Sequence, residues 1–244
     1  MTYCVAAKLT AGLVFISDTR TNAGIDHIAT FRKLHVFGVA GERLIVLQSA
    51  GNLATSQAVI SLLQQRLNTD WVNLNSVSSL FAATTLVSDT MREVLERDMQ
   101  GVLAKGVDMS CSFLLGGQIQ GGAPELYNIY PQGNFIAATE DTPYFQIGES
   151  KYGKPILDRS LDCFSSLQDA LRCALISFDS TLRSNLSVGM PLDVLVYHSD
   201  SLNIPAGFRV EEDDEYYNLI RQRWSAELSK ALTELPEPSN CYGL

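Results

Sequence analysis

Two short runs of this sequence are apolar at every position, and they constrain the fold more than any other feature. They are residues 13–16 (LVFI) and residues 44–47 (LIVL). Successive side chains of a strand point to opposite faces of its sheet, so a strand that is apolar throughout needs cover on both faces. The runs are also far shorter than the roughly 18–20 residues of a membrane span. We therefore expect sheets that lie between other layers, in a protein that does not cross a membrane.

Turn signals and apolar periodicity divide the chain into alternating blocks of strands and helices. Strands are predicted at residues 3–9, 13–18, 34–39, 43–49, 112–119, 125–130, 134–138, 144–147 and 193–198. Amphipathic helices are predicted within residues 59–67, 77–95, 167–182 and 216–232, and a helical block begins near residue 150. Ser76 is a plausible N-cap of the second helix, and the acidic run 211–215 is interpreted as the first turn of the last one. No linker or repeat divides this order, which favours a single α+β domain over residues 1–244 with a four-layer αββα sandwich.

Charge and cysteine usage exclude several classes of function. The 27 Asp and Glu residues outnumber the 18 Lys and Arg residues, which gives a net charge of −9. Such a chain repels phosphate backbones and anionic lipid surfaces, so neither nucleic acid nor a membrane is an expected partner. The five cysteines include no CxxC pair and indicate reduced thiols; since no signal peptide is visible, they favour a cytoplasmic protein. No motif predicts a metal or another cofactor.

The N-terminus supplies the main candidate for catalysis. Thr2 follows the initiator Met1, and a side chain as small as that of threonine allows removal of this methionine. Processing would leave one residue with a β-hydroxyl and a free α-amine, whose ordinary pKa is about 7.7–8.0. The amine can accept the hydroxyl proton near neutral pH, so one residue would supply both nucleophile and base without a histidine. Taken alone, however, Thr2 is an ordinary threonine at the start of a strand.

Charged residues are expected close to Thr2. A hairpin with a three-residue turn at 10–12 places four residues on one face: Thr2, Cys4, Asp18 and Arg20. A turn of two residues would reverse this relation. Lys33 leads the next strand, where a lysine near the threonine hydroxyl would favour the alkoxide and Asp18 would keep that lysine charged.

These residues carry a resemblance to a known family. The opening T-x-x-V, the segment S-D-x-R-x-N at residues 17–22 and the strand lysine together resemble a β-type subunit of the proteasome. Residues 21–33 (TNAGIDHIATFRK) look most like the bacterial ancestral β-subunit branch, called Anbu. The resemblance covers the whole chain and implies an N-terminal-nucleophile hydrolase, in which the threonine adds to a peptide carbonyl, forms an acyl ester and releases it to water. Thr2 would be nucleophile and base, Lys33 would tune its hydroxyl, and Asp18 would anchor Lys33.

The resemblance also implies supporting positions. The glycine that donates its N–H to the oxyanion falls near Gln48 or, two to three residues on, at Ala50-Gly51, and the serine after the mid-chain Ile-Gly falls on Glu149 or, with a one-residue shift, on the next residue. The R-D-x-x-S-G loop appears as residues 183–188, with Ser184 in place of its aspartate. The expected supporting residues are Arg20, Ser150 and Ser187, and the expected oxyanion or substrate-binding residues are Thr21, Asn22, Gln48 and Gly51.

The leading hypothesis is a threonine peptidase that acts on peptides or unfolded protein within a homo-oligomer, either a ring or an open ring-like stack. Two alternatives stay open: a proteasome-like assembly subunit with little or no protease activity, and an amidase for small molecules. Removal of Met1 distinguishes the peptidase from the assembly subunit, because a blocked amine cannot act as a base. Nothing in the sequence resembles an ATPase, so unfolding of substrates would have to come from elsewhere.

Overall fold

The structure is a computed structural model that describes residues 2–22, 28–99 and 106–238. The chain forms two compact units, Met1–Glu212 and Asp213–Leu244. The first contains both sheets and four of the helices described below, and the second contains the helix α5 (Glu215–Thr233). The single domain expected over residues 1–244 stays a prediction.

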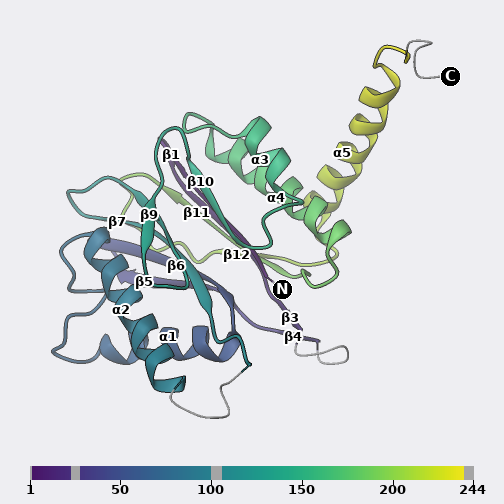
Figure 1. Cartoon of the computed structure of the whole chain (residues 1–244). Coiled ribbons are helices and arrows are strands. Elements are labelled where there is room, and N and C mark those ends of the chain that lie inside the picture. Colours follow the sequence, from purple (N-terminus) through teal and green to yellow (C-terminus); the bar gives the residue numbers. More distant parts are fainter. Residues whose placement is uncertain (1, 23–27, 100–105, 239–244) are drawn as a thin grey trace. The chain divides into compact units, whose positions relative to one another are not determined.

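Two five-stranded antiparallel sheets form the centre of the first unit (Figure 1). One has the order β10-β1-β2-β11-β12, with β10 at Tyr144–Gly148, β1 at Tyr3–Leu9, β2 at Gly12–Asp18, β11 at Leu192–His198 and β12 at Phe208–Val210. The other has the order β5-β6-β7-β8-β9, with β5 at Leu34–Val39, β6 at Arg43–Gly51, β7 at Cys111–Ile119, β8 at Glu125–Ile129 and β9 at Phe135–Ala137. A small ribbon of β3 (Arg20–Asn22) and β4 (Ile28–Thr30) joins β2 to β5.

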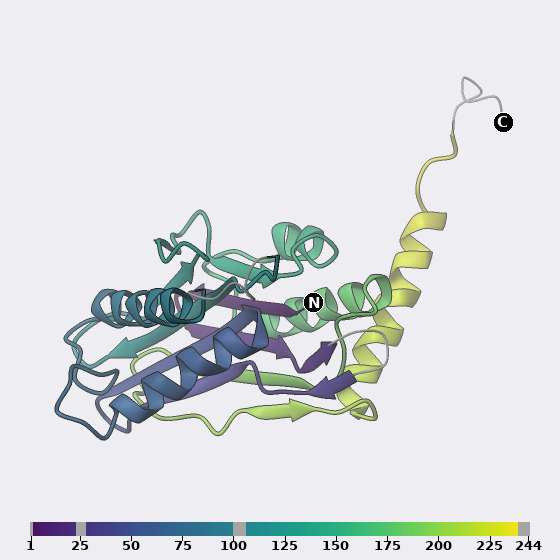
Figure 2. The same cartoon turned by 60° about the horizontal axis from the view of Figure 1, so that its bottom comes forward.

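Helix pairs cover the outer face of each sheet, as Figures 1 and 2 show. Helices α1 (Leu53–Arg66) and α2 (Leu80–Asp98) pack on the sheet that contains β6 and β7, and α4 (Leu167–Ser184), which follows α3 (Lys154–Ser160), packs on β1 and β2. The predicted αββα sandwich is therefore confirmed. Within the described ranges, no helix is long and apolar enough to cross a membrane.

The apolar runs of the sequence explain why the layers hold together. Alternate residues of β2 and β6, such as Phe15 and Val46, face the other sheet in one buried cluster. The residues between them in β6, such as Ile45 and Leu47, pack against α1 and α2 in a second cluster. Each fully buried side chain of this kind contributes roughly 1.5–3 kcal/mol to the free energy of unfolding. A strand that is apolar on both faces is thus stable only in the middle of the sandwich.

The predicted register of the first hairpin is wrong. Leu9 pairs with Gly12, so the turn contains two residues and Cys4 lies opposite Ser17. A shift of one residue moves every side chain to the other face. Thr2, Cys4, Asp18 and Arg20 therefore do not share a face, and Asp18 comes next to the backbone of Tyr3.

Two local expectations also need correction. The N-cap of α2 is Ser79, whose hydroxyl accepts the amide of Ala82, and not Ser76. The last helix begins only at Glu215 with Asp214 as its N-cap, so most of the acidic run precedes it. The three-residue strands β3, β4 and β12 were not predicted, because so short a segment carries no readable alternation.

Candidate active site

Thr2 and Lys33 line one cavity of about 460 Å³ at one end of the sandwich. Thr2 precedes β1, and Lys33 lies between β4 and β5. The end of β6 and the start of α1 also line the cavity, with Gly51 and Asn52 among the residues. Sequence positions that are far apart thus meet around one space, as the N-terminal threonine hypothesis requires.

Lys33 is held by a buried ion pair. Its Nζ lies 2.6 Å from Oδ1 of Asp18, and the two side chains are 5% and 0% exposed. The same ammonium donates to the carbonyl of Arg20 at 2.7 Å. The Asp18 carboxylate also accepts the Tyr3 amide at 3.0 Å and the Gly189 amide at 3.4 Å. These contacts fix the lysine at the cavity wall.

Opposing effects act on the pKa of Asp18. Burial raises the pKa of Asp18 above its ordinary value, while the Lys33 charge and the hydrogen bonds from Lys33 and two backbone amides act to lower it. A buried carboxylate without such partners would take up a proton. The charged form of Asp18 therefore depends on Lys33.

The main chain of Thr2 is held by the turn after β10. Its carbonyl accepts the amide of Glu149 at 2.7 Å, and Thr2 itself is only 9% exposed. Gly148 has φ +81°, and a Cβ there would lie 2.1 Å from the Thr2 oxygen. Only glycine fits this close approach. The position of Thr2 is therefore fixed from both β1 and β10.

Gly51, rather than Gln48, reaches the cavity. Gly51 has φ +105°, and a Cβ at this position would lie 2.5 Å from the carbonyl oxygen of Ser110. The Gln48 side chain is buried elsewhere and donates to the Ile16 carbonyl at 2.8 Å. Helix α1 begins beside Gly51 with Asn52 as its N-cap, so the positive end of its dipole lies at the cavity. This wall suits a group that becomes negatively charged during a reaction.

The other expected residues separate into two groups. Thr21 lines the cavity, whereas Arg20 donates from Nη1 to the Leu186 carbonyl at 3.2 Å. Asn22 ends β3, and its side chain lies outside the described part of the chain. Ser150 and Ser187 are not among the residues that line the cavity.

A buried carboxylate connects the segments of Ser150 and Ser187. Glu149 accepts the amides of Ser150 and Lys151, both at 2.9 Å, and the side-chain amide of Asn185 at 2.8 Å. Asn185 in turn accepts the Ser187 amide at 3.0 Å. Burial raises the pKa of Glu149, but these hydrogen bonds lower it, so the pKa lies below its ordinary value. The resemblance had pointed to the loop at residues 183–188, but no sequence signal had singled out Asn185 within it. Among the described residues, no three His, Cys, Asp or Glu side chains gather as a metal site.

One known protein family matches most of the chain. The family model described as proteasome subunit matches residues 2–196. The chain belongs to the proteasome subunit family. The family match begins at Thr2 and includes both Asp18 and Lys33.

Solved structures of Anbu proteins are similar over nearly the whole chain. The helical assembly of the Anbu complex from Pseudomonas aeruginosa is 65% identical with a TM-score of 0.96, covering 98% of this chain and 99% of that one. Anbu from Yersinia bercovieri is 55% identical with a TM-score of 0.92, covering 97% and 99%. A Gly-1 mutant of Anbu from Hyphomicrobium sp. strain MC1 is 46% identical with a TM-score of 0.92, covering 98% and 100%. No curated protein matches the chain.

Proposed function

We propose that this proteasome-family subunit is a threonine peptidase with Thr2 as nucleophile. The observation that carries the proposal is the buried Lys33–Asp18 ion pair at the wall of the cavity that Thr2 lines. An ammonium group close to a hydroxyl favours the alkoxide. The cavity also contains the space and the helix N-terminus that a peptide carbonyl and its oxyanion need.

The proposed reaction uses Thr2 twice. After removal of Met1, the Thr2 hydroxyl attacks a peptide carbonyl, and its proton passes to the α-amine of the same residue. The oxyanion forms beside the backbone of Gly51 and the start of α1. Collapse releases the amine product and leaves an acyl ester on Thr2, which water hydrolyses. Asp18 acts through Lys33 and does not touch the substrate.

We also propose that the chain works as a homo-oligomer in the cytoplasm. The Pseudomonas relative forms a helical assembly, and it matches this chain along almost its full length. Several large apolar side chains are exposed, including Phe164 at 78% and Leu186 at 86%, and such residues often mark contacts between subunits. Cys4, Cys111, Cys163 and Cys173 are free thiols, which is typical of a reducing compartment.

The proposal is tested with the pair of variants Thr2→Ala and Thr2→Ser. Intact-mass measurement should show the loss of Met1 in both and in the wild type. Peptide hydrolysis should fall at least about a thousandfold in Thr2→Ala but persist in Thr2→Ser, which keeps a hydroxyl. Sedimentation of all three as the same large species would show that assembly is unaffected. Wild-type hydrolysis rates in Thr2→Ala would overturn the assignment.

Retention of Met1 in the wild type would favour the assembly-subunit alternative, because the proposed base would then be missing. Turnover of small amides but not of peptides of any length would favour the amidase alternative. Both outcomes are read from the same preparations.

A further inference from the structure

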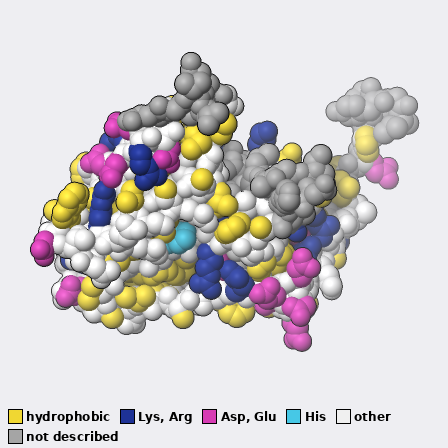
Figure 3. Space-filling view, turned by 90° about the horizontal axis from the view of Figure 1, so that it is seen from below, with side chains coloured by type: hydrophobic (Ala, Val, Ile, Leu, Met, Phe, Trp, Pro, Cys, Tyr) yellow, Lys and Arg dark blue, Asp and Glu magenta, His cyan; other side chains and the backbone are white. Residues whose placement is uncertain are grey.

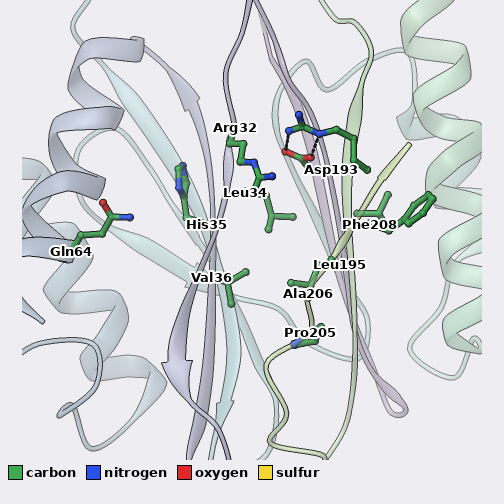
Figure 4. A pocket seen from close by; sticks show the side chains of 13 residues that line it. Arg32, Leu34, His35, Val36, Gln64, Asp193, Leu195, Pro205, Ala206 and Phe208 are labelled. Atoms are coloured by element: carbon green, nitrogen blue, oxygen red, sulfur yellow. Dashed lines mark hydrogen bonds and ion pairs between the residues drawn. The ribbon is translucent and has the colours of Figure 1, made fainter. Parts of the chain in front are cut away.

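A second cavity, of about 520 Å³, lies between the edges of the two sheets (Figure 4). Strand β5 is the outermost strand of one sheet, and β12 is the outermost strand of the other. The cavity is lined by residues 34–36 of β5, residues 193–195 of β11, residues 205–209 around β12, and by Arg32 and Gln64. Its volume lies within the range of ordinary ligand sites.

Much of the lining is apolar. Leu34 and Val36 of β5 face Leu195 of β11 and the segment that carries Pro205 and Ala206 (Figure 4). Val36 is 37% exposed, so a bound apolar group can cover its side chain. This wall can take an aliphatic or aromatic group.

The residues that line the cavity include two arginines and one aspartate. Asp193 is paired with Arg209 through two hydrogen bonds, 2.8 Å from Nε and 3.0 Å from Nη2, so these two charges compensate each other. The Arg32 side chain extends toward the same space, and no hydrogen bond or ion pair joins it to another residue in the described ranges (Figure 4). Figure 3 shows basic side chains next to a histidine and bordered by apolar groups on one face of the molecule.

His35 adds a polar group without adding charge. Burial lowers the pKa of His35, the Arg32 charge lowers it further, and Asp193 acts in the opposite direction. Burial therefore disfavours the charged imidazole, and among the described residues Arg32 is the cation of the cavity without an ion-pair partner.

We propose that this cavity binds the C-terminal residue of a peptide that ends in an apolar side chain. The planar Arg32 guanidinium matches a carboxylate, with which it can form two parallel hydrogen bonds. One net positive charge beside Asp193 suits a monocarboxylate better than a doubly charged phosphate. The apolar side chain of the last residue would lie against Val36 and Leu195. The open edges of β5 and β12 offer backbone groups to the residues before it.

The proposal is independent of catalysis, and its test uses the full chain with Thr2→Ala so that no probe is consumed. Calorimetric titration with acetyl-Ala-Ala-Phe should give saturable binding. Arg32→Gln in this background should weaken it about ten- to hundredfold, since a hydrogen-bonded charge pair is lost. Val36→Ala should weaken it several-fold. Arg159→Gln, which changes an exposed arginine on α3, is the matched control and should leave binding unchanged.

Two further probes identify which part of the ligand is recognised. The amide acetyl-Ala-Ala-Phe-NH₂ should bind at least tenfold more weakly than the acid, and the loss should be absent in Arg32→Gln. 3-Phenylpropanoate, which has the carboxylate and the ring but no peptide backbone, should also bind more weakly. Equal binding of acid and amide, or full affinity in Arg32→Gln, would overturn the site. Equal binding of the phenylpropanoate would overturn the assignment to a peptide.

Discussion

Replacement of Lys33 by methionine removes the partner of a carboxylate that water cannot reach. Asp18 is fully buried, and the Lys33 ammonium at 2.6 Å is the main group that stabilises its charge. Methionine has a similar length and fills much of the same volume without a charge. The folded protein must then keep Asp18 either unpaired or protonated.

The size of the effect follows from the cost of protonating Asp18. A free aspartate has a pKa of about 3.9, and each pH unit above that value costs about 1.4 kcal/mol to hold the group neutral. At pH 7 the penalty is therefore about 4 kcal/mol, similar to the roughly 3–5 kcal/mol found when one partner of a buried ion pair is removed.

The sign of the pH dependence follows directly. In Lys33→Met the loss of the ammonium raises the folded-state pKa of Asp18 further above its unfolded value than in the wild type. The folded state then binds the proton more tightly, so the penalty is absent below about pH 3.9 and grows as the pH rises. Urea unfolding at pH 5 and pH 7.5, at one fixed protomer concentration, should give a loss near 1.5 kcal/mol at pH 5 and at least twice that at pH 7.5.

The double variant Lys33→Met with Asp18→Asn is the control. It removes the buried charge altogether and should recover much of the stability at pH 7.5, although it should remain inactive. Equal destabilisation of Lys33→Met at both pH values, with no recovery in the double variant, would refute the argument that the ion pair keeps Asp18 charged.

Three other predictions rest on single features of the structure. Gly51→Ala should lower the free energy of unfolding by about 2–4 kcal/mol in urea titration, because its φ is +105° and its Cβ would lie 2.5 Å from the Ser110 oxygen. In the pH profile of peptide-ester turnover, the acidic limb should reflect the Thr2 amine and lie at or below that amine's ordinary pKa of about 7.7–8.0. A variant with all three histidines changed to glutamine should keep this limb. A shift of the limb by more than about one pH unit in that variant would indicate a histidine base. Thiol reagents followed by peptide mapping should modify Cys163 before Cys4, since burial raises the pKa of the fully enclosed Cys4 thiol, and the reverse order would contradict that burial.

The sequence predicted the layers well because burial on both faces leaves a strong signal. Continuous apolar runs such as residues 13–16 and 44–47 can only lie in the middle of a sandwich. Helical stripes are equally readable when a helix has one buried face, as α4 does. The fold was therefore accessible from hydrophobic patterning and needed no exact pairing of strands.

The site was predicted less completely, because pairing decides which side chains meet. A turn one residue shorter placed Asp18 beside the backbone of Tyr3, yet Lys33 still reaches its carboxylate. The contact between Asn185 and Glu149 joins residues 36 positions apart and leaves no periodic trace in the sequence. The second cavity is similar, since Arg32 and Asp193 come together only through the edges of two sheets.

The central claim, that Thr2 is the nucleophile, is tested most directly by trapping its acyl ester. The wild-type protein is mixed with a peptide p-nitrophenyl ester, quenched with acid within seconds, and analysed by intact mass and peptide mapping. We predict a chain that lacks Met1 and carries one acyl group on Thr2, with no adduct in Thr2→Ala. An adduct on another residue, or an unmodified chain that still begins with Met1, would contradict the account.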